Sequence, residues 1–409
     1  MDATIELLLS LALLLAVGLL LTRVCNLIHL PNVTAYLLAG LLLSPYTFGI
    51  IDEKLISSFS VFSEVALGFI AFSIGFCFKV SHLKTLGKGV FIITVTQALL
   101  TAILVDAAML VLYFCGAVEL PVVFVLGAIA TATAPAATLL VVHQYKAQGP
   151  VTDTLLPVVA IDDAIGLIIF SISLAVSQTI ASGAEFSAAV LLDPLREIGL
   201  SLLIGAALGF IVAGGVKVFH SRANRLTIII LCIFAGVALS KLWDLSSLLL
   251  CMMIGAIYCN FDSHTEPVMD VYDRWSHPLY VLFFVVSGAQ LNVRILLEVG
   301  IVGIVYILSR VVGKYSGAAL GATLAKSDEN VKKYLGLTLF PQAGVAIGMA
   351  QVVAADFPAY APIITTVVLS ATLVYELIGP LITKAALEKA GEITVPKKPA
   401  KKESHEKTA

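Results

Sequence analysis

Charged residues are scarce in this chain. They make up 13% of its 409 residues, against about 25% in typical soluble proteins, while hydrophobic residues make up 59%. Such a chain lacks the polar surface that a soluble globular protein needs. The 25 basic and 27 acidic residues give a net charge of −2, so charge balance favours neither a nucleic-acid partner nor an acidic substrate. The composition predicts an all-α polytopic membrane protein.

Clustered cysteines and low-complexity segments are also missing. The six cysteines, in or beside apolar stretches and without a CxxC spacing, are Cys25, Cys77, Cys115, Cys232, Cys251 and Cys259. This pattern indicates buried thiols rather than a disulfide framework or a metal site. The 30 glycines and 15 prolines are spread along the apolar runs, which excludes a collagen-like or disordered chain.

The sequence consists mainly of apolar runs long enough to span a membrane. A helix needs about 20 apolar residues to cross the hydrocarbon core. We predict thirteen transmembrane helices, at approximately 4–22, 33–50, 59–78, 89–115, 119–142, 152–178, 192–217, 225–241, 244–260, 276–291, 295–323, 331–354 and 360–385. The first run begins with Asp2 and Glu6 and lacks a basic n-region, so we expect a retained helix rather than a signal peptide. Residues 1–390 are then one transmembrane domain, and the Lys-rich segment 391–409 is a disordered cytoplasmic tail.

Basic residues are distributed unevenly between the two sets of loops. Most of the 25 Lys and Arg residues fall in loops and in the tail on one side. Cytoplasmic loops carry the excess of Lys and Arg. We therefore expect the N-terminus outside and the C-terminus in the cytoplasm, in the inner cell membrane.

Two predicted spans are interrupted at matching positions. Thirteen spans divide into a repeat at about 4–178, a linker helix at about 192–217 and a second, inverted repeat at about 225–385. The fifth span of the first repeat contains Thr131–Pro135, and the fifth span of the second contains Phe340–Gly348. Matched Pro and Gly interruptions point to a transporter site built from two crossed discontinuous helices. The alternative is that these residues merely kink continuous helices.

Few ionisable residues fall inside the predicted spans, and such residues are functional candidates because charge is costly in a bilayer. Asp162 and Asp163 lie about 15 Å into the sixth span, near the midplane. Neighbouring side chains on a helix point about 100° apart, so one carboxylate can face an ion path while another partner holds the other. A carboxylate in a medium of low dielectric favours its protonated form, so proton and monovalent cation can compete for it.

The basic candidates are Arg310 and Lys314, four residues apart and so on one helix face. We expect one of them to be the counter-charge of Asp162. Lys314 lies nearer the cytoplasmic end and could instead extend to the interface. Glu64, Asp106 and Glu376 are further candidates for the ion path or for partners of the helix breaks. Like-charged half-helix ends meet where two breaks cross, and we expect Asp106 or Glu376 to neutralise them.

Four segments carry a resemblance to a known family: TATAP from Thr131, IDDAIGL from Ile161, SRVVGK from Ser309 and FPQAGVAIG from Phe340. Over all thirteen predicted spans the chain resembles the monovalent cation:proton antiporter superfamily, in its bacterial second branch. The resemblance implies a homodimer with a dimerisation domain and a mobile six-helix core that moves in an elevator-like step. Relatives with glutathione-controlled potassium export carry a nucleotide-binding domain after the last span, and no such domain is expected after Leu387.

The resemblance also implies roles for individual residues. Asp163 matches the aspartate that binds cation and proton, and Asp162 matches the residue paired with a basic side chain. Thr131, Thr133 and backbone carbonyls would complete the cation's oxygen shell. Arg310 matches the position where electrogenic members usually have Lys. Since Arg keeps its proton, this departure suggests electroneutral exchange, unless Lys314 acts as a second proton carrier.

The predicted function is secondary active exchange of Na⁺ (or Li⁺) for H⁺ in pH homeostasis, with no enzyme activity and no cofactor. K⁺/H⁺ exchange on the same fold is the close alternative. A gated cation channel is less favoured because no TVGYG-like filter or acidic ring occurs. An intramembrane aspartyl protease needs two Asp on separate helices, and the pair here is adjacent.

Overall fold

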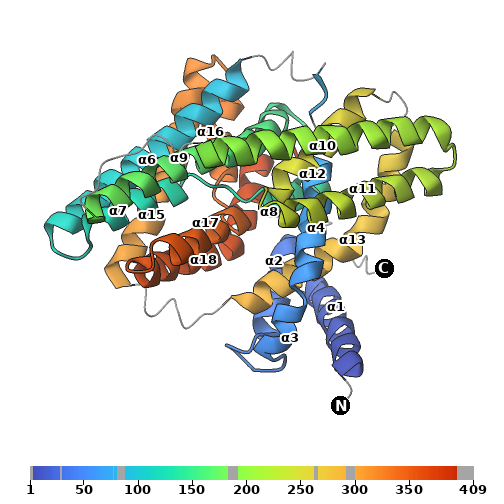
Figure 1. The fold of residues 1–409 in the computed structure, drawn as a ribbon, viewed down its shortest axis with the longest axis horizontal. Helices are drawn as coiled ribbons and strands as arrows, with labels where there is room; N and C mark the ends of the chain where they lie inside the picture. The colour runs from blue at the N-terminus through green and yellow to red at the C-terminus, as the bar shows by residue number, and fades with distance from the viewer. Residues whose placement is uncertain are drawn as a thin grey trace, which may run out of the picture.

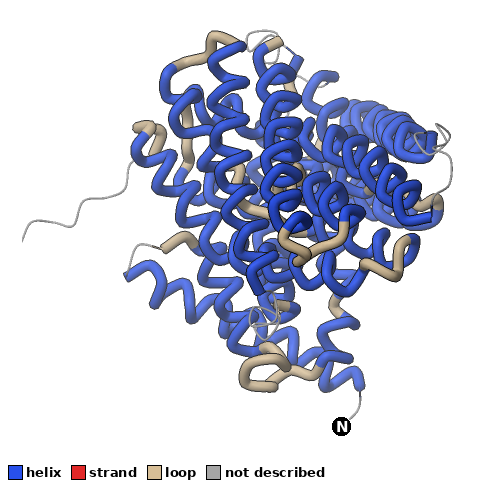
Figure 2. The backbone as a smooth tube through the Cα atoms, turned by 90° about the vertical axis from the view of Figure 1, so that its left-hand side faces the viewer, coloured by secondary structure: helices blue, strands red, loops and turns tan. Residues whose placement is uncertain are grey.

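The computed structural model describes residues 3–27, 30–76, 78–80, 88–182, 192–261, 266–291 and 300–393. The regular secondary structure in this part of the chain is all helical, with loops and turns between the helices and no strand (Figure 2). Seven of its helices are long and apolar enough to cross a membrane, namely α1, α6, α9, α10, α11, α15 and α18. The prediction of an all-α polytopic membrane protein is thus confirmed.

The helices form two groups in space. In Figure 1, α6, α7 and α15–α18 lie on one side of the molecule, and α1–α4 with α11–α13 lie on the other. The unbroken helices are α1 (Ala3–Leu27), α2 (Asn32–Leu43), α3 (Glu53–Ser58), α4 (Ser60–Phe76), α6 (Gly89–Phe114), α9 (Pro150–Ser182), α10 (Leu192–Val218), α11 (Arg222–Leu242), α12 (Ser247–Phe261), α13 (Glu266–Gln290), α15 (Gly300–Leu324) and α18 (Ala361–Lys389).

Two predicted spans are each represented by a pair of short helices. The fifth span is α7 (Leu120–Ile129) followed by α8 (Pro135–Tyr145), and the twelfth is α16 (Glu329–Thr338) followed by α17 (Gly344–Asp356). Both interruptions therefore separate half-helices and do not merely kink a continuous one. Proline explains part of this, because Pro135 has no N–H to offer to a continuing helix.

Glycines on α15 set how closely it approaches α6. A Cβ added at Gly313, Gly317 or Gly321 would lie 2.7–2.8 Å from the backbone Cα atoms of Thr101, Gln97 or Ile93 on α6. Small residues four apart let two membrane helices pack backbone to backbone. This contact brings the Lys314 turn of α15 against the Gln97 turn of α6.

The predicted start of the tail at residue 391 needs correction. Glu392 and Ile393 are each only 7% exposed, and Ile393 belongs to the hydrophobic core. The chain turns at Gly391, whose φ of +78° suits glycine, and the Glu392 amide then bonds back to Leu387 O at 3.0 Å. Packing against the helices therefore extends to residue 393, and residues 394–409 lie outside the described part.

Candidate functional site

The two interruptions lie against each other. The amide of Ala134, in the segment between α7 and α8, donates to the carbonyl of Pro341, between α16 and α17, at 2.8 Å. The Gln342 side chain donates to Ile129 O at 2.9 Å, across the same crossing. Irregular backbone at membrane depth must find its hydrogen bonds within the protein. Each interruption thus supplies partners for the other.

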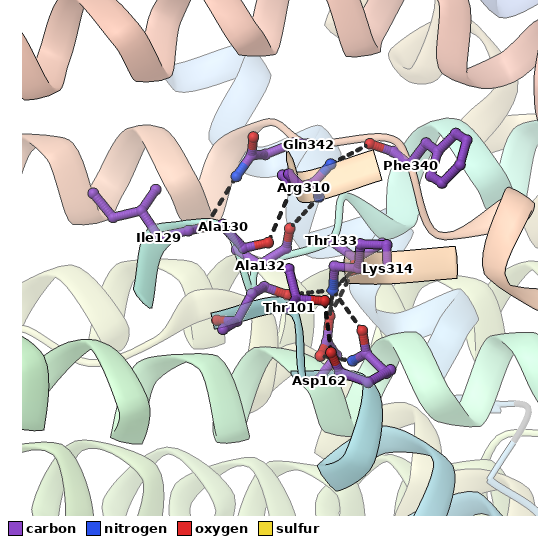
Figure 3. A network of polar contacts seen from close by, with 12 residues as sticks. Thr101, Ile129, Ala130, Ala132, Thr133, Asp162, Arg310, Lys314, Phe340 and Gln342 are labelled. Atoms are coloured by element: carbon purple, nitrogen blue, oxygen red, sulfur yellow. Dashed lines mark hydrogen bonds and ion pairs between the residues drawn. The ribbon is translucent and has the colours of Figure 1, made fainter. Parts of the chain in front are cut away.

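Arg310 of α15 donates hydrogen bonds to both interruptions (Figure 3). Its Nε donates to Ala130 O at 2.9 Å, Nη2 to Ala132 O at 2.7 Å and Nη1 to Phe340 O at 2.8 Å. The guanidinium also stacks on the ring of Tyr375 at 4.5 Å and is completely buried. Carbonyl groups at a helix C-terminus have no intrahelical partner and carry partial negative charge. A fixed fork of N–H donors satisfies three carbonyls at once.

This geometry corrects two expectations. The charged groups bonded to the interruptions are the cations Arg310 and Lys314, not Asp106 or Glu376, because the groups bonded here include backbone carbonyls, which accept from a cation. Arg310 is also not the residue that holds Asp162, since its donors reach backbone carbonyls. Its position on α15, one turn before Lys314, places it at the crossing rather than beside α9.

Lys314 is the basic partner of Asp162. Its ammonium lies 3.1 Å from Asp162 Oδ2, and both side chains are fully buried. It also donates to Gln97 Oε1 and Thr133 Oγ1, each at 2.8 Å, and to the carbonyl of Thr131. A compact ammonium can face several oxygen atoms arranged around it. These contacts keep Lys314 inside the protein and exclude the expectation that it extends to the interface.

Asp162 has its oxygen atoms satisfied. The Gln97 amide donates to Oδ1. Thr133 Oγ1 donates to Oδ2 at 2.6 Å, beside the Lys314 contact (Figure 3). Buried carboxylate oxygens need hydrogen-bond partners, and both oxygens of Asp162 have them. Asp162 is therefore engaged within the protein.

Asp163 has the opposite environment. It is 5% exposed, and neither carboxylate oxygen has a hydrogen-bond partner among the described residues. A Cβ added at Gly166, one turn further along α9, would lie 3.0 Å from Thr131 Oγ1, so α9 passes directly against the first interruption. A buried ionised carboxylate without a partner is costly. Asp163 is thus the member of the acid pair whose oxygens are left without a partner among the described residues.

Thr131 and Thr133 both lie at the site, but their hydroxyl groups have different hydrogen-bond partners. Thr133 lies between Lys314 and Asp162, accepting from one and donating to the other. Thr131 uses its hydroxyl proton on Ala128 O at 2.7 Å, which leaves its oxygen lone pairs to accept. Both oxygens remain candidates for a cation shell.

The remaining sequence candidates lie elsewhere. Glu64 pairs with Lys241 at 2.6 Å, with 34% and 60% of the side chains exposed, and this pair is on the surface. Asp106 on α6 is packed against Gly127 of α7, where a Cβ would overlap its carboxylate. Glu376 on α18 is buried. One carboxylate oxygen each of Asp106 and Glu376 lacks a hydrogen-bond partner within the described residues.

Sequence reasoning missed Gln97 and Gln342. Gln97 bridges Asp162 and Lys314, and Gln342 bridges the interruptions while its amide also reaches the Tyr306 hydroxyl at 3.1 Å. A search for ionisable residues in membrane spans passes over amides. Their signal is a long polar side chain inside an apolar span, which is also costly to bury without partners.

In the described part of the chain, no three His, Cys, Asp or Glu side chains come together, so these residues form no ligand set for a bound metal cofactor. The site instead offers single carboxylate, hydroxyl and carbonyl oxygens. Oxygen donors of this type suit hard cations.

Comparison with known proteins agrees with this picture. The family model described as "Sodium/hydrogen exchanger, transmembrane" matches residues 10–389. Two solved structures of the sodium proton antiporter MjNhaP1 from Methanocaldococcus jannaschii share the fold at 20% identity. The one at pH 8 has a TM-score of 0.70 and covers 96% of this chain and 97% of that one. The other, from electron microscopy, has a TM-score of 0.76 and covers 97% and 100%. No curated protein sequence matches significantly.

The buried acid pair at crossed half-helices and the match over nearly the whole chain lead to one conclusion. The chain belongs to the sodium/hydrogen exchanger family of the monovalent cation:proton antiporter superfamily, and is a multi-pass membrane transporter of the cation/proton antiport type rather than an enzyme.

Proposed function

We propose that the protein exchanges Na⁺ or Li⁺ for H⁺, with both ions competing for the carboxylate of Asp163. The observation that carries this proposal is the contrast between neighbours: Asp162 has its oxygens satisfied, while Asp163 is buried with neither oxygen bonded to a described residue. A group in that environment binds one positive species at a time. Thr131, Thr133 and carbonyls of the first interruption would supply further oxygens.

Lys314 gives this site a second group able to release a proton. A buried ammonium is stabilised by its ion pair, and a cation arriving at Asp163 adds positive charge beside it. Loss of the Lys314 proton would relieve that repulsion. We therefore propose that two protons move per monovalent cation, with net charge transfer. The electroneutral hypothesis depended on Arg310 as the partner of Asp162, which the contacts of Arg310 do not support.

The membrane arrangement we propose has thirteen crossings. Each predicted run overlaps a helix or a pair of half-helices, which supports this arrangement. In it, the two interruptions would fall at equivalent places in repeats of opposite orientation. The two spatial groups of helices in Figure 1 fit a core that carries the site and a second domain that forms a homodimer. An elevator-like movement of the core would then expose Asp163 alternately to the two sides, with the N-terminus outside and the C-terminus in the cytoplasm.

Proteoliposome flux measurements test the function. Proton movement driven by Na⁺, Li⁺ and K⁺ gradients should be strong for Na⁺ or Li⁺ and absent with Asp163→Asn. Asp106→Asn is the control, a half-buried carboxyl group on α6 that packs against Gly127 and makes none of the bonds described for Asp162, Lys314 and Arg310. Flux driven by K⁺ alone would favour the K⁺/H⁺ alternative. Cation flow without a counter-gradient of protons would indicate a channel, and an active Asp163→Asn protein would contradict the site.

A further inference from the structure

The helix that carries Asp162 and Asp163 has an unusual N-terminus. α9 begins at Pro150, so the residue before it is Gly149, which has no side chain. Helices usually receive a hydrogen-bond acceptor from a Ser, Thr, Asp or Asn at that position, because the first-turn N–H groups have no intrahelical partner. Pro150 has no N–H, but Val151 and Thr152 each have one. The local sequence offers these amides no preceding cap.

Glu392 supplies the missing cap from the other end of the chain. Its Oε1 accepts from Val151 N at 2.6 Å, and its Oε2 accepts from Thr152 N at 2.8 Å and from Thr152 Oγ1 at 2.6 Å. The Glu392 carbonyl in turn accepts from Gln148 N at 3.1 Å. A carboxylate also complements the partial positive charge of a helix N-terminus. With 7% of its surface exposed, Glu392 is an integral part of the helix start.

The absence of a side chain at Gly149 leaves room for the Glu392 carboxylate. A Cβ at Gly149 would lie 2.6–2.8 Å from the side-chain atoms of Glu392, and Gly149 has a φ of +150°. Any other residue there would displace the carboxylate. On the other side, Ala390 O accepts from Asn330 Nδ2 of α16 at 3.3 Å. The short segment that follows α18 thus holds the start of α9 and contacts the start of α16.

We propose that Glu392 is a positioning residue for the ion site, acting through the axial placement of α9. This proposal depends on the proposed function. Val151 and Asp162 are eleven residues apart, or about 16 Å along the helix. No hydrogen bond from the described residues holds the Asp163 carboxylate, so its place relative to Thr131 follows from where α9 lies. Glu392 fixes the end of α9 that is predicted to face the cytoplasm, and Gly166 contacts the first interruption beyond the acid pair.

The test combines a transport-independent measurement with a transport measurement on the full-length protein. Hydrogen–deuterium exchange of the peptide containing Val151 and Thr152 should be about tenfold faster in Glu392→Gln, since a charged acceptor bonded to buried amides is lost. In proteoliposomes, the apparent Na⁺ affinity of the same variant should fall several-fold at an unchanged maximal rate. Glu392→Asp, which keeps the charge, should restore part of both values. Glu388→Gln, an exposed carboxylate one turn earlier, should change neither.

Unchanged amide exchange in Glu392→Gln would overturn the capping contact. Faster amide exchange with unaltered apparent affinity would overturn the positioning role. If Glu392→Gln folds poorly, Thr152→Val removes one bond to the same carboxylate and should give the same changes at smaller size. A wild-type protein without Na⁺ exchange would refute the proposed function, while the amide measurement would still decide the contact itself.

Discussion

Lys314 and Arg310 lie one turn apart on α15 and bind different parts of the site. The Lys314 ammonium lies 3.1 Å from Asp162 on α9, while the Arg310 guanidinium donates to carbonyls of both interruptions. The chemistry of each side chain fits the partners that it binds. A planar fork of donors suits separated carbonyls, and a compact ammonium suits oxygens grouped around one point. Exchanging the two residues would therefore not conserve the site.

Replacing Lys314 with Arg should abolish net charge movement. Arg keeps its proton at any accessible pH, so a second proton could not be released, and the larger guanidinium would also disturb Gln97 and Thr133. Transient currents after Na⁺ addition to proteoliposomes measure this directly. Lys241→Arg, at the surface pair with Glu64, is the control and should leave the current intact. A full current from Lys314→Arg would rule out Lys314 as a proton carrier.

Replacing Arg310 with Lys should destabilise the fold rather than only weaken cation binding. At least one of the three bonded carbonyls would lose its partner, at about 1–3 kcal/mol for each buried group left unsatisfied. Thermal unfolding of the detergent-solubilised protein should show a lower midpoint for Arg310→Lys. Arg222→Lys, at the exposed start of α11, should have the wild-type midpoint. Equal midpoints for both variants would show that the crossing does not depend on Arg310.

Gln97→Leu should impair exchange although no charge is altered. The amide donates to Asp162 and accepts from Lys314, so an apolar side chain leaves both buried groups short of a partner. We expect a several-fold lower apparent Na⁺ affinity, measured by flux against Na⁺ concentration. Gln290→Leu, at the exposed end of α13, serves as the control. Wild-type affinity in Gln97→Leu would remove Gln97 from the site.

Gly317→Leu should disrupt the packing of α15 on α6. A Cβ at Gly317 already lies 2.7 Å from Gln97 Cα, so a larger side chain must push the helices apart and carry Lys314 away from Asp162. Folded yield, measured by size-exclusion chromatography, should fall sharply. Gly214→Leu is the matched control, because a Cβ there meets nothing within 4 Å. Similar yields for both variants would contradict this account of the interface.

Asp106→Asn and Glu376→Gln should leave the folded yield near that of the wild type. Each of these carboxyl groups has a buried oxygen without a partner among the described residues, and Arg310 already bonds the carbonyl ends at the crossing. Neutral amides should therefore be tolerated. The yield of monodisperse protein in detergent measures this. A large loss in either variant would restore the idea that these acids neutralise the half-helix ends.

The sequence alone determined the class of protein and the places where its chemistry lies. Apolar runs predicted the helices, because backbone groups in lipid must bond within a helix. The interruptions at Thr131–Pro135 and Phe340–Gly348 followed from Pro and Gly in otherwise apolar spans. Asp162 and Asp163 were evident because buried charge is costly and rare in a membrane.

Only the tertiary structure decided which side chains meet. Arg310 and Lys314 share a helix face, so their spacing could not show which one reaches Asp162. That choice depends on how α15 is placed against α6, which the backbone contacts at Gly313 and Gly317 set. The role of Glu392 could not be predicted for a similar reason. It caps α9 from about 240 residues away along the chain, and no local sequence pattern indicates a contact between distant segments.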